Sequence, residues 1–119
     1  MVFRTSAAVI DGTMTDLVVS DFDDGLLIVV SQYKKPGAFF RVQKMVVDHP
    51  QDMGDGSPQA YAIRTMFGSD FEDRLFSAAN FLAEDLLLPD NTVISLALRD
   101  SSPKVLKIVS QMIRKNKTW

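Results

Sequence analysis

The residues best suited to chemistry gather in one polar stretch, from Asp48 to Pro58. The only histidine of the chain, His49, stands there close to Asp48 and Asp52, and together they could hold a metal ion or transfer protons. Such sites need side chains in a fixed geometry. A stretch with two prolines, two glycines and three aspartates has little apolar surface with which to fix them, so we expect a loop without a catalytic or metal centre.

Other patterns typical of enzymes and cofactor sites are missing or incomplete. The run Asp52-x-Gly54-x-Gly56 resembles the start of a calcium loop, but the later ligands and the bidentate glutamate do not follow. The chain has no cysteine, no Gly-x-Ser-x-Gly motif and no glycine-rich phosphate loop. The sequence therefore predicts a protein that is not an enzyme and that carries neither metal nor cofactor.

Composition narrows the class further. The 119 residues are 46% hydrophobic and 24% charged, which is typical of one globular domain spanning residues 1–119. A formal charge of −2 gives no general attraction to nucleic acid, and no window approaches the roughly 20 apolar residues of a membrane span. With no secretory signal visible, we expect a cytoplasmic protein, with the nucleus as a further location.

Strand patterns fill most of the chain. Apolar and polar residues alternate, or apolar residues run together, over 4–10, 13–20, 26–30, 38–42, 60–67 and 92–99. Asp11-Gly12 is a strong hairpin signal, and Gly37 is expected to accept positive φ in the turn after Lys34-Lys35-Pro36. Because the turns between the first four strands are short, they favour an antiparallel meander. Tyr61, Ile63, Thr65 and Phe67 are expected on one side of the fifth strand.

Two amphipathic helices complete the pattern. Ser69-x-x-Glu72 has the form of a capping box, and an apolar stripe with spacings of three and four continues to Leu86 before Pro89. Ser102 caps the second helix, with Pro103 at its first position. The adjacent Glu84 and Asp85 are interpreted as a solvated helix face.

This inventory predicts an α+β fold, in which a mainly antiparallel sheet of about six strands has both helices on one face. Two helices of about 10 Å width cannot cover both faces of such a sheet. The run from Leu26 to Val30 is apolar on both sides of its strand, so the second face needs a cover as well. We expect that cover to be another subunit, packed sheet on sheet. The candidate dimer interface residues are Leu27, Val29, Phe39 and Phe40.

With these elements in place, the chain resembles the family of proteasome assembly chaperone 3. The resemblance rests on Leu-Leu-Ile-Val-Val-Ser-Gln-Tyr at 26–33 with the lysine-glycine turn after it, and on Phe67-Gly68 before the first helix. Ser-Leu-Ala-Leu-Arg-Asp at 95–100 and the terminal Trp119 extend it nearly from end to end. The chain departs from the family pattern mainly in its loop 48–58 and in its basic segment Lys115–Lys117.

The resemblance implies a non-enzymatic chaperone that assists assembly of the alpha ring of the proteasome core particle. It implies a heterodimer with the fourth proteasome assembly chaperone subunit, with a homodimer as a further form, and transient contact with proteasome alpha subunits. Our candidates for that contact are Asp48, His49, Asp52, Met53 and Asp55. The alternative is a dimeric adaptor or scaffold domain of a trafficking or signalling complex, because small sheet-and-helix domains also serve there.

Overall fold

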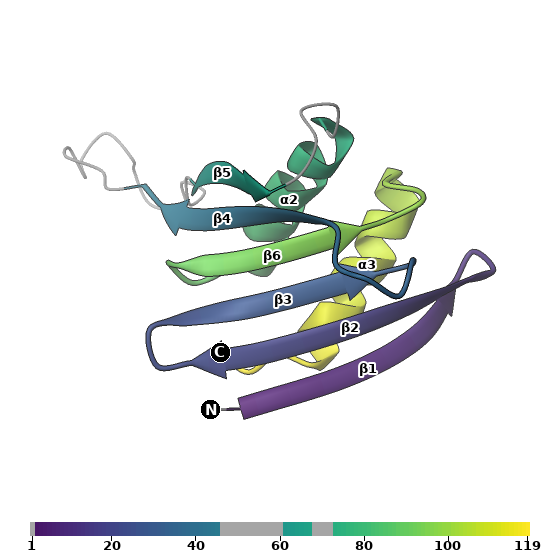
Figure 1. Ribbon diagram of the computed structural model, residues 1–119, viewed down its shortest axis with the longest axis horizontal. Coiled ribbons are helices and arrows are strands. Elements are labelled where there is room, and N and C mark those ends of the chain that lie inside the picture. The colour runs from purple at the N-terminus through teal and green to yellow at the C-terminus, as the bar shows by residue number, and fades with distance from the viewer. Residues whose placement is uncertain (1, 46–60, 68–72) are drawn as a thin grey trace.

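The computed structural model describes residues 2–45, 61–67 and 73–119, and this part forms one six-stranded sheet with two helices packed on it (Figure 1). The strands are β1 (Val2–Ile10), β2 (Thr13–Phe22), β3 (Gly25–Ser31), β4 (Ala38–Lys44), β5 (Tyr61–Phe67) and β6 (Thr92–Ala97), and the helices are α2 (Asp73–Leu86) and α3 (Pro103–Lys115). The expected α+β class is confirmed. The predicted loop 48–58 and the capping box at 69–72 lie outside the described residues.

The strand order is β1-β2-β3-β6-β4-β5, and every neighbouring pair is antiparallel except β3 and β6 (Figure 1). In that parallel pair, Ile28 lies beside Ile94. The expected meander of the first four strands is therefore wrong in one place: β3 and β4 are not paired with each other. Instead, β6 lies between them and pairs with both, and β4 pairs with β5 on its other side. The connection between Ser31 at the end of β3 and Ala38 at the start of β4 is long enough to pass over the end of β6. The two strands it joins therefore need not pair as a hairpin.

Gly37 lies where this connection crosses the end of β6. A Cβ atom at position 37 would come within 2.2 Å of the Leu96 carbonyl oxygen and 2.8 Å of the Ala97 Cα. The Gly37 amide donates to the Ser95 hydroxyl at 3.2 Å, which fixes the crossing. The expectation that Gly37 supplies a positive φ is wrong, since Lys34 takes that conformation with a φ of 62°. Glycine is required at 37 for close approach.

The hairpin predicted at Asp11-Gly12 is confirmed. Both residues have positive φ, at 50° and 78°, and Ile10 is paired with Thr13. This geometry matches the twist of the two flanking strands, and few residue pairs other than Asp-Gly and Asn-Gly adopt it easily. The turn therefore sets the register of β1 on β2.

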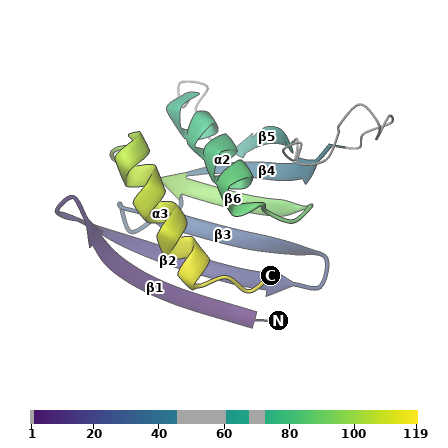
Figure 2. The ribbon, with the colours of Figure 1, turned by 180° about the vertical axis from the view of Figure 1, so that it is seen from behind.

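Both described helices pack against the same face of the sheet, and Figure 2 shows them side by side in front of it. Helix α3 begins at Pro103 as predicted, with Ser102 at the N-cap position. The Ser102 hydroxyl makes no capping hydrogen bond, however, and donates instead to the Asp100 carboxylate at 3.3 Å. The apolar faces of the helices meet the inward side chains of the strands in one core; its large fully buried members include Leu17, Ile28, Phe40, Leu82, Ile94, Leu96 and Ile113. Of the helices that the structure describes, neither has the length and apolar character needed to cross a bilayer.

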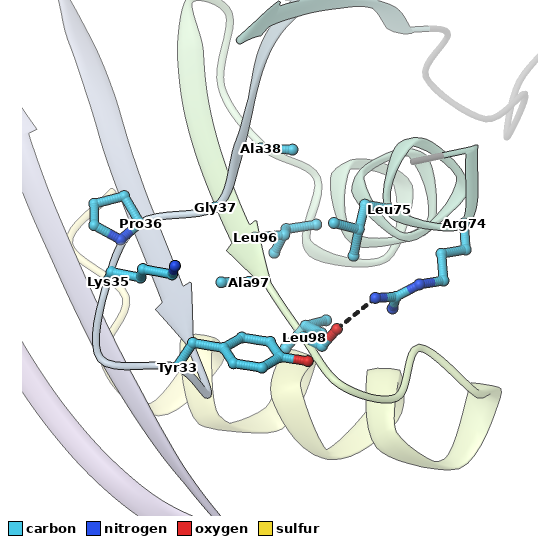
Figure 3. A pocket seen from close by; sticks show the side chains of 10 residues that line it. All are labelled: Tyr33, Lys35, Pro36, Gly37, Ala38, Arg74, Leu75, Leu96, Ala97 and Leu98. Carbon is cyan, nitrogen blue, oxygen red and sulfur yellow. Dashed lines mark hydrogen bonds between the residues drawn. The ribbon is translucent and has the colours of Figure 1, made fainter. Parts of the chain in front are cut away.

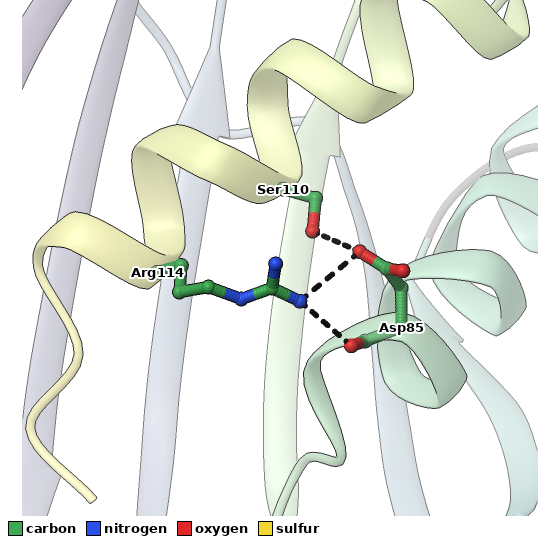
Figure 4. Close-up of polar contacts among 3 residues, drawn as sticks. All are labelled: Asp85, Ser110 and Arg114. Carbon is green, nitrogen blue, oxygen red and sulfur yellow. Dashed lines mark hydrogen bonds and ion pairs between the residues drawn. The ribbon is translucent and has the colours of Figure 1, made fainter.

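Asp85 joins the two helices (Figure 4). Its carboxylate accepts a hydrogen bond from the buried Ser110 hydroxyl, and Arg114 donates to the Asp85 carbonyl oxygen at 2.9 Å. The Arg114 guanidinium also lies 3.4 Å from the Asp85 carboxylate. Glu84 and Asp85 lie on an exposed helix face, as interpreted from the sequence, and Asp85 in addition fixes α3 against the end of α2.

Trp119 folds back onto the domain. Its ring is partly buried against the core, and the Lys117 ammonium lies 5.4 Å from the ring centroid. An indole in this position covers apolar surface of the core. The sequence left the placement of Trp119 open, and the structure assigns the ring to intramolecular packing.

Candidate interaction surface

The side of the sheet opposite the helices, termed here the open face, has no cover among the described residues (Figures 1 and 2). Strand alternation and the register of the ladders define its members. They are Phe3, Thr5, Ala7 and Val9 on β1; Met14, Asp16, Val18, Ser20 and Phe22 on β2; Leu27, Val29 and Ser31 on β3; Val93, Ser95 and Ala97 on β6; Phe39, Arg41 and Gln43 on β4; and Ala62, Arg64 and Phe67 on β5.

Apolar side chains run across the centre of the open face. Val18 is paired with Val29, and Leu27 is paired with Val93, so aliphatic residues of three neighbouring strands lie side by side on this face. These four side chains are half-buried because their neighbours crowd them. At the margin, Phe3 is 60% exposed. A contiguous apolar surface of this kind is typical of a protein–protein contact.

Three of the four residues predicted for the dimer interface lie on the open face. Val29 and Phe39 flank Ser95, with which each is in register, and Leu27 lies two residues before Val29. Phe40 does not belong with them. It is 1% exposed and packs edge-to-face on Phe76 of α2, with ring centroids 6.1 Å apart.

The assignment of Phe40 to the interface is therefore corrected. Adjacent residues of a strand point to opposite faces, so Phe39 and Phe40 cannot both face a partner. The apolar character of both residues made the choice ambiguous in the sequence. Phe40 belongs to the core.

Phe67 joins the open face because the ladder between β4 and β5 is irregular. Phe39 is paired with Phe67, whereas the next residue, Phe40, is paired with Thr65, so the register shifts between them. The expectation that Phe67 shares a side with Tyr61 and Ile63 is therefore wrong. Across the shifted pair, the rings of Phe39 and Phe67 meet edge-to-face at 6.1 Å, and Phe67 is 69% exposed. The shift adds a second aromatic ring to the surface.

Two arginines oppose each other on the same surface. Arg41 of β4 is directly paired with Arg64 of β5, and like charges in this position repel. One Arg41 nitrogen donates to the Asn91 side-chain oxygen at 3.0 Å. Its Nε is buried without a hydrogen-bond partner among the described residues. The pair forms a cationic corner beside the apolar centre of the open face.

Two observations concern metal ligands and titratable groups in the described part of the chain. Within 2–45, 61–67 and 73–119, no three histidine, cysteine or carboxylate side chains are grouped as metal ligands would be. Burial raises the pKa of the Tyr61 phenol above its ordinary value of 10.0, and the Glu84 carboxylate adds to the rise. The Tyr61 hydroxyl donates to the Leu88 carbonyl at 2.8 Å, so its role is structural.

The predicted alpha-subunit contacts Asp48, His49, Asp52, Met53 and Asp55 all lie outside the described residues. Their role stays a prediction. Two further features of the surface carry no signal in the amino-acid sequence. Neither the opposed arginines nor the aromatic pair of Phe39 and Phe67 could be found without the register of β4 on β5.

Comparison with known proteins shows which family the chain matches. The model of the family described as proteasome assembly chaperone 3 matches residues 28–116. A protein of Nematostella vectensis named proteasome assembly chaperone 3 is 30% identical over 116 residues, which cover 91% of this chain and 83% of that protein.

A solved structure agrees in fold. It is a chain from the crystal structure of a novel chaperone complex for yeast 20S proteasome assembly, similar with a TM-score of 0.69. The match covers 97% of this chain and 98% of that one, at 13% sequence identity. The sequence matches favour the chaperone expectation over the adaptor alternative.

Proposed function

Because the chain belongs to the proteasome assembly chaperone 3 family, a non-enzymatic family, we propose that it works as one subunit of a dimeric chaperone for the proteasome alpha ring. The observation that carries the dimeric form is the open face, whose centre is apolar and has no cover in the described chain. A chaperone that orders other subunits needs surfaces for two kinds of contact, one lasting and one transient. The open face is our candidate for the lasting contact.

The proposed lasting partner is a second chaperone subunit of similar fold, the fourth proteasome assembly chaperone. A similar sheet could pack face to face on this one at a layer spacing of roughly 10 Å. The cationic corner favours a partner other than a second copy of this chain, because Arg41 and Arg64 would be stabilised by carboxylates on the facing surface. Among the open-face strand residues of this chain, Asp16 is the one carboxylate. A homodimer is the form proposed for the isolated chain.

The proposed transient partner is one or more proteasome alpha subunits, and the proposed contact is the loop 48–58. Charged groups at a contact speed encounter and fix orientation more than they tighten binding. That balance suits a chaperone that must release its client. The proposal includes a cytoplasmic site of action with access to the nucleus, which microscopy of the tagged chain would test.

The dimer proposal is tested by mass measurement in solution, for the chain alone and mixed with the candidate second subunit. Val29→Glu puts a charge at the centre of the open face, where it would be buried without a partner. We expect this variant to remain folded but to elute as a monomer and to lose the second subunit. Gln111→Glu makes the same charge change on the exposed side of α3 and should associate like the wild type.

The dimer proposal fails if the wild-type chain is monomeric both alone and with the second subunit. It also fails if Val29→Glu associates as well as Gln111→Glu. Circular dichroism of both variants separates lost association from lost folding.

A further inference from the structure

Two hollows flank Tyr33 at the end of the sheet where β3 and β6 terminate. The first has a volume of about 300 Å³ and an apolar floor and wall that include Leu96, Leu98 and Leu75 (Figure 3). The second, of about 380 Å³, lies between Tyr33, Arg99 and the turn from β1 to β2. Tyr33 lines both hollows, so its ring forms a ridge between them.

Polar groups converge on the first hollow. In Figure 3 the Lys35 ammonium and the Tyr33 hydroxyl point into it from the β3–β4 connection, and Arg74 reaches across from α2. The Arg74 guanidinium donates to the Leu98 carbonyl at 2.7 Å, which holds it at the rim. A guanidinium has five N–H donors, so this bond leaves further donors for a guest. The hollow thus combines an apolar base with two cationic groups.

A buried side chain holds the ridge in place. Gln32 is 7% exposed, donates to the Thr15 hydroxyl at 2.9 Å and accepts the Arg99 amide at 2.8 Å. The Arg99 guanidinium in turn lies 5.2 Å from the centroid of the Tyr33 ring. Cation–π contact of this kind and the fixed backbone beneath it order the ridge before any partner binds, which lowers the cost of binding.

The volume of the two hollows and the charge of their lining residues indicate which kind of group would bind there. Each hollow can take one side chain of a partner, and its volume lies at the lower limit of pockets that hold a whole small-molecule ligand. Lys34 and Arg99 line the second hollow, so both hollows present cations beside apolar carbon. Carboxylates on short apolar stems match this chemistry. In an extended segment, alternate side chains lie on one side about 7 Å apart, which allows one chain to fill hollows on either side of a ridge.

We propose that this end of the sheet, with Tyr33 as its ridge, is a docking site for an extended acidic segment of a partner protein. One glutamate or aspartate side chain would enter beside Lys35 and Arg74, and another would lie beside Arg99. The site is separate from the apolar centre of the open face. Binding here goes beyond the proposed dimerisation, and the test below reads peptide binding directly, whatever the oligomeric state.

The test uses two synthetic peptides, Gly-Glu-Leu-Glu-Leu-Glu-Gly and its counterpart with glutamine in place of every glutamate. Each is titrated into the full, isotope-labelled chain while amide resonances are followed by NMR. We expect the acidic peptide to shift the amides of Tyr33, Lys35, Gly37 and Arg99. The glutamine peptide should bind at least roughly tenfold more weakly, because it lacks the charge-assisted bonds.

Two double variants then locate the site. Lys35→Gln with Arg74→Gln should weaken binding of the acidic peptide by about tenfold or more, and raising the salt concentration should weaken binding to the wild type. Lys107→Gln with Lys115→Gln removes the same charge from exposed positions of α3 and should change the affinity less than about twofold. Because Arg74 bonds to Leu98, thermal melting checks the fold of the first pair. If that pair unfolds, the single change Lys35→Gln decides, with a loss of several-fold expected.

Several results would overturn the docking site. They are equal affinity for the two peptides, resonance shifts centred on β1 or α3, no shifts at millimolar acidic peptide, or full affinity in folded Lys35→Gln. The dimer proposal would survive each of them, because its test depends on Val29 and not on this end of the sheet.

Discussion

Arg41 and Arg64 stand directly opposite each other across β4 and β5, and both side chains lie on the open face. Opposed like charges destabilise a sheet, at a cost of roughly 0.2–1 kcal/mol. A partner with carboxylates in this place would turn the repulsion into attraction. The pair therefore links the stability of the isolated chain to its choice of partner.

Replacing Arg64 by glutamine separates these two effects. We expect the free energy of unfolding of the isolated chain to rise by roughly 0.2–1 kcal/mol, since the repulsion is relieved. Association with the second chaperone subunit should weaken at the same time. Urea unfolding and titration calorimetry measure the two quantities. Lys44→Gln, at an exposed position of the neighbouring strand β4, should leave both quantities nearly unchanged. Parallel losses in stability and association for Arg64→Gln would contradict this account.

Gly37 gives a prediction about packing. Gly37→Ala places a methyl group within 2.2 Å of the Leu96 carbonyl oxygen, so the crossing over β6 must shift. We expect a loss of roughly 2–4 kcal/mol, comparable to other severe steric changes in buried positions. In Gly12→Ala the added methyl group has no neighbouring atom within 4 Å, so only the positive φ is unfavourable. We expect this variant to lose about 1 kcal/mol of stability. Equal losses in the two variants, measured by urea unfolding, would rule out close approach as the reason for glycine at 37.

Gln32 gives a prediction about buried hydrogen bonds. Gln32→Ala leaves the Arg99 amide and the Thr15 hydroxyl without their side-chain partner. The expected cost is roughly 1–3 kcal/mol, the usual penalty for buried polar groups left unpaired. Gln43→Ala, at an exposed position, should change stability by less than about 0.5 kcal/mol. Faster hydrogen exchange at Arg99 in the first variant alone would confirm the cause.

Tyr61 predicts a dependence of stability on alkaline pH. Its pKa is raised in the folded protein, so the unfolded chain loses the phenol proton first as the pH increases. The stabilisation is complete below the ordinary pKa of 10.0 and falls as the pH rises from there through the folded pKa. Tyr61→Phe also removes the hydrogen bond to Leu88, at a cost of about 1 kcal/mol near neutral pH.

The measurement for Tyr61 is urea unfolding at several pH values on either side of 10. We expect the wild type to lose more stability than Tyr61→Phe over the alkaline range. Tyr33→Phe is a matched control at an exposed tyrosine. A variant Tyr61→Phe that loses as much as the wild type would assign the alkaline loss to other groups.

The loop 48–58 is tested by neutralisation. Replacing Asp48, Asp52 and Asp55 by asparagine removes three charges and keeps the side chains similar in size. If the loop meets alpha subunits, capture of recombinant alpha subunits should fall by several-fold, mainly through slower association, while the dimer persists. Replacing Asp23 and Asp24, in the turn between β2 and β3, by asparagine is the control at another acidic turn. Unchanged capture by the loop variant would remove the loop from the proposed function.

Local sequence patterns predicted single strands and helices well, but they predicted which strands pair with each other less well. Asp11-Gly12 and Pro103 act on their own backbone, so the hairpin and the start of α3 were found where the sequence placed them. The insertion of β6 beside β3 depends on contacts between Ile28 and Ile94, which are far apart in the chain. No periodicity encodes such a choice.

The candidate surface shows the same division. Alternation along β3 was sufficient to put Leu27 and Val29 together on one face. Phe39 and Phe40 are chemically alike, and the register of β4 on β6, which places Phe40 beside the buried Ile94, decides which of them is buried. The register shift that brings Phe67 beside Phe39 adds one residue to one strand, and a pattern of period two cannot reveal where it occurs.

The place of β6 in the middle of the sheet has a consequence for biosynthesis. Strands β3 and β4 emerge early from the ribosome, yet both must wait for Thr92–Ala97 before their inner edges are paired. Until then the nascent chain presents two unsatisfied strand edges, which invite pairing with other chains. A protein of an assembly-chaperone family thus passes through a vulnerable interval of its own, which ends only when β6 has been made.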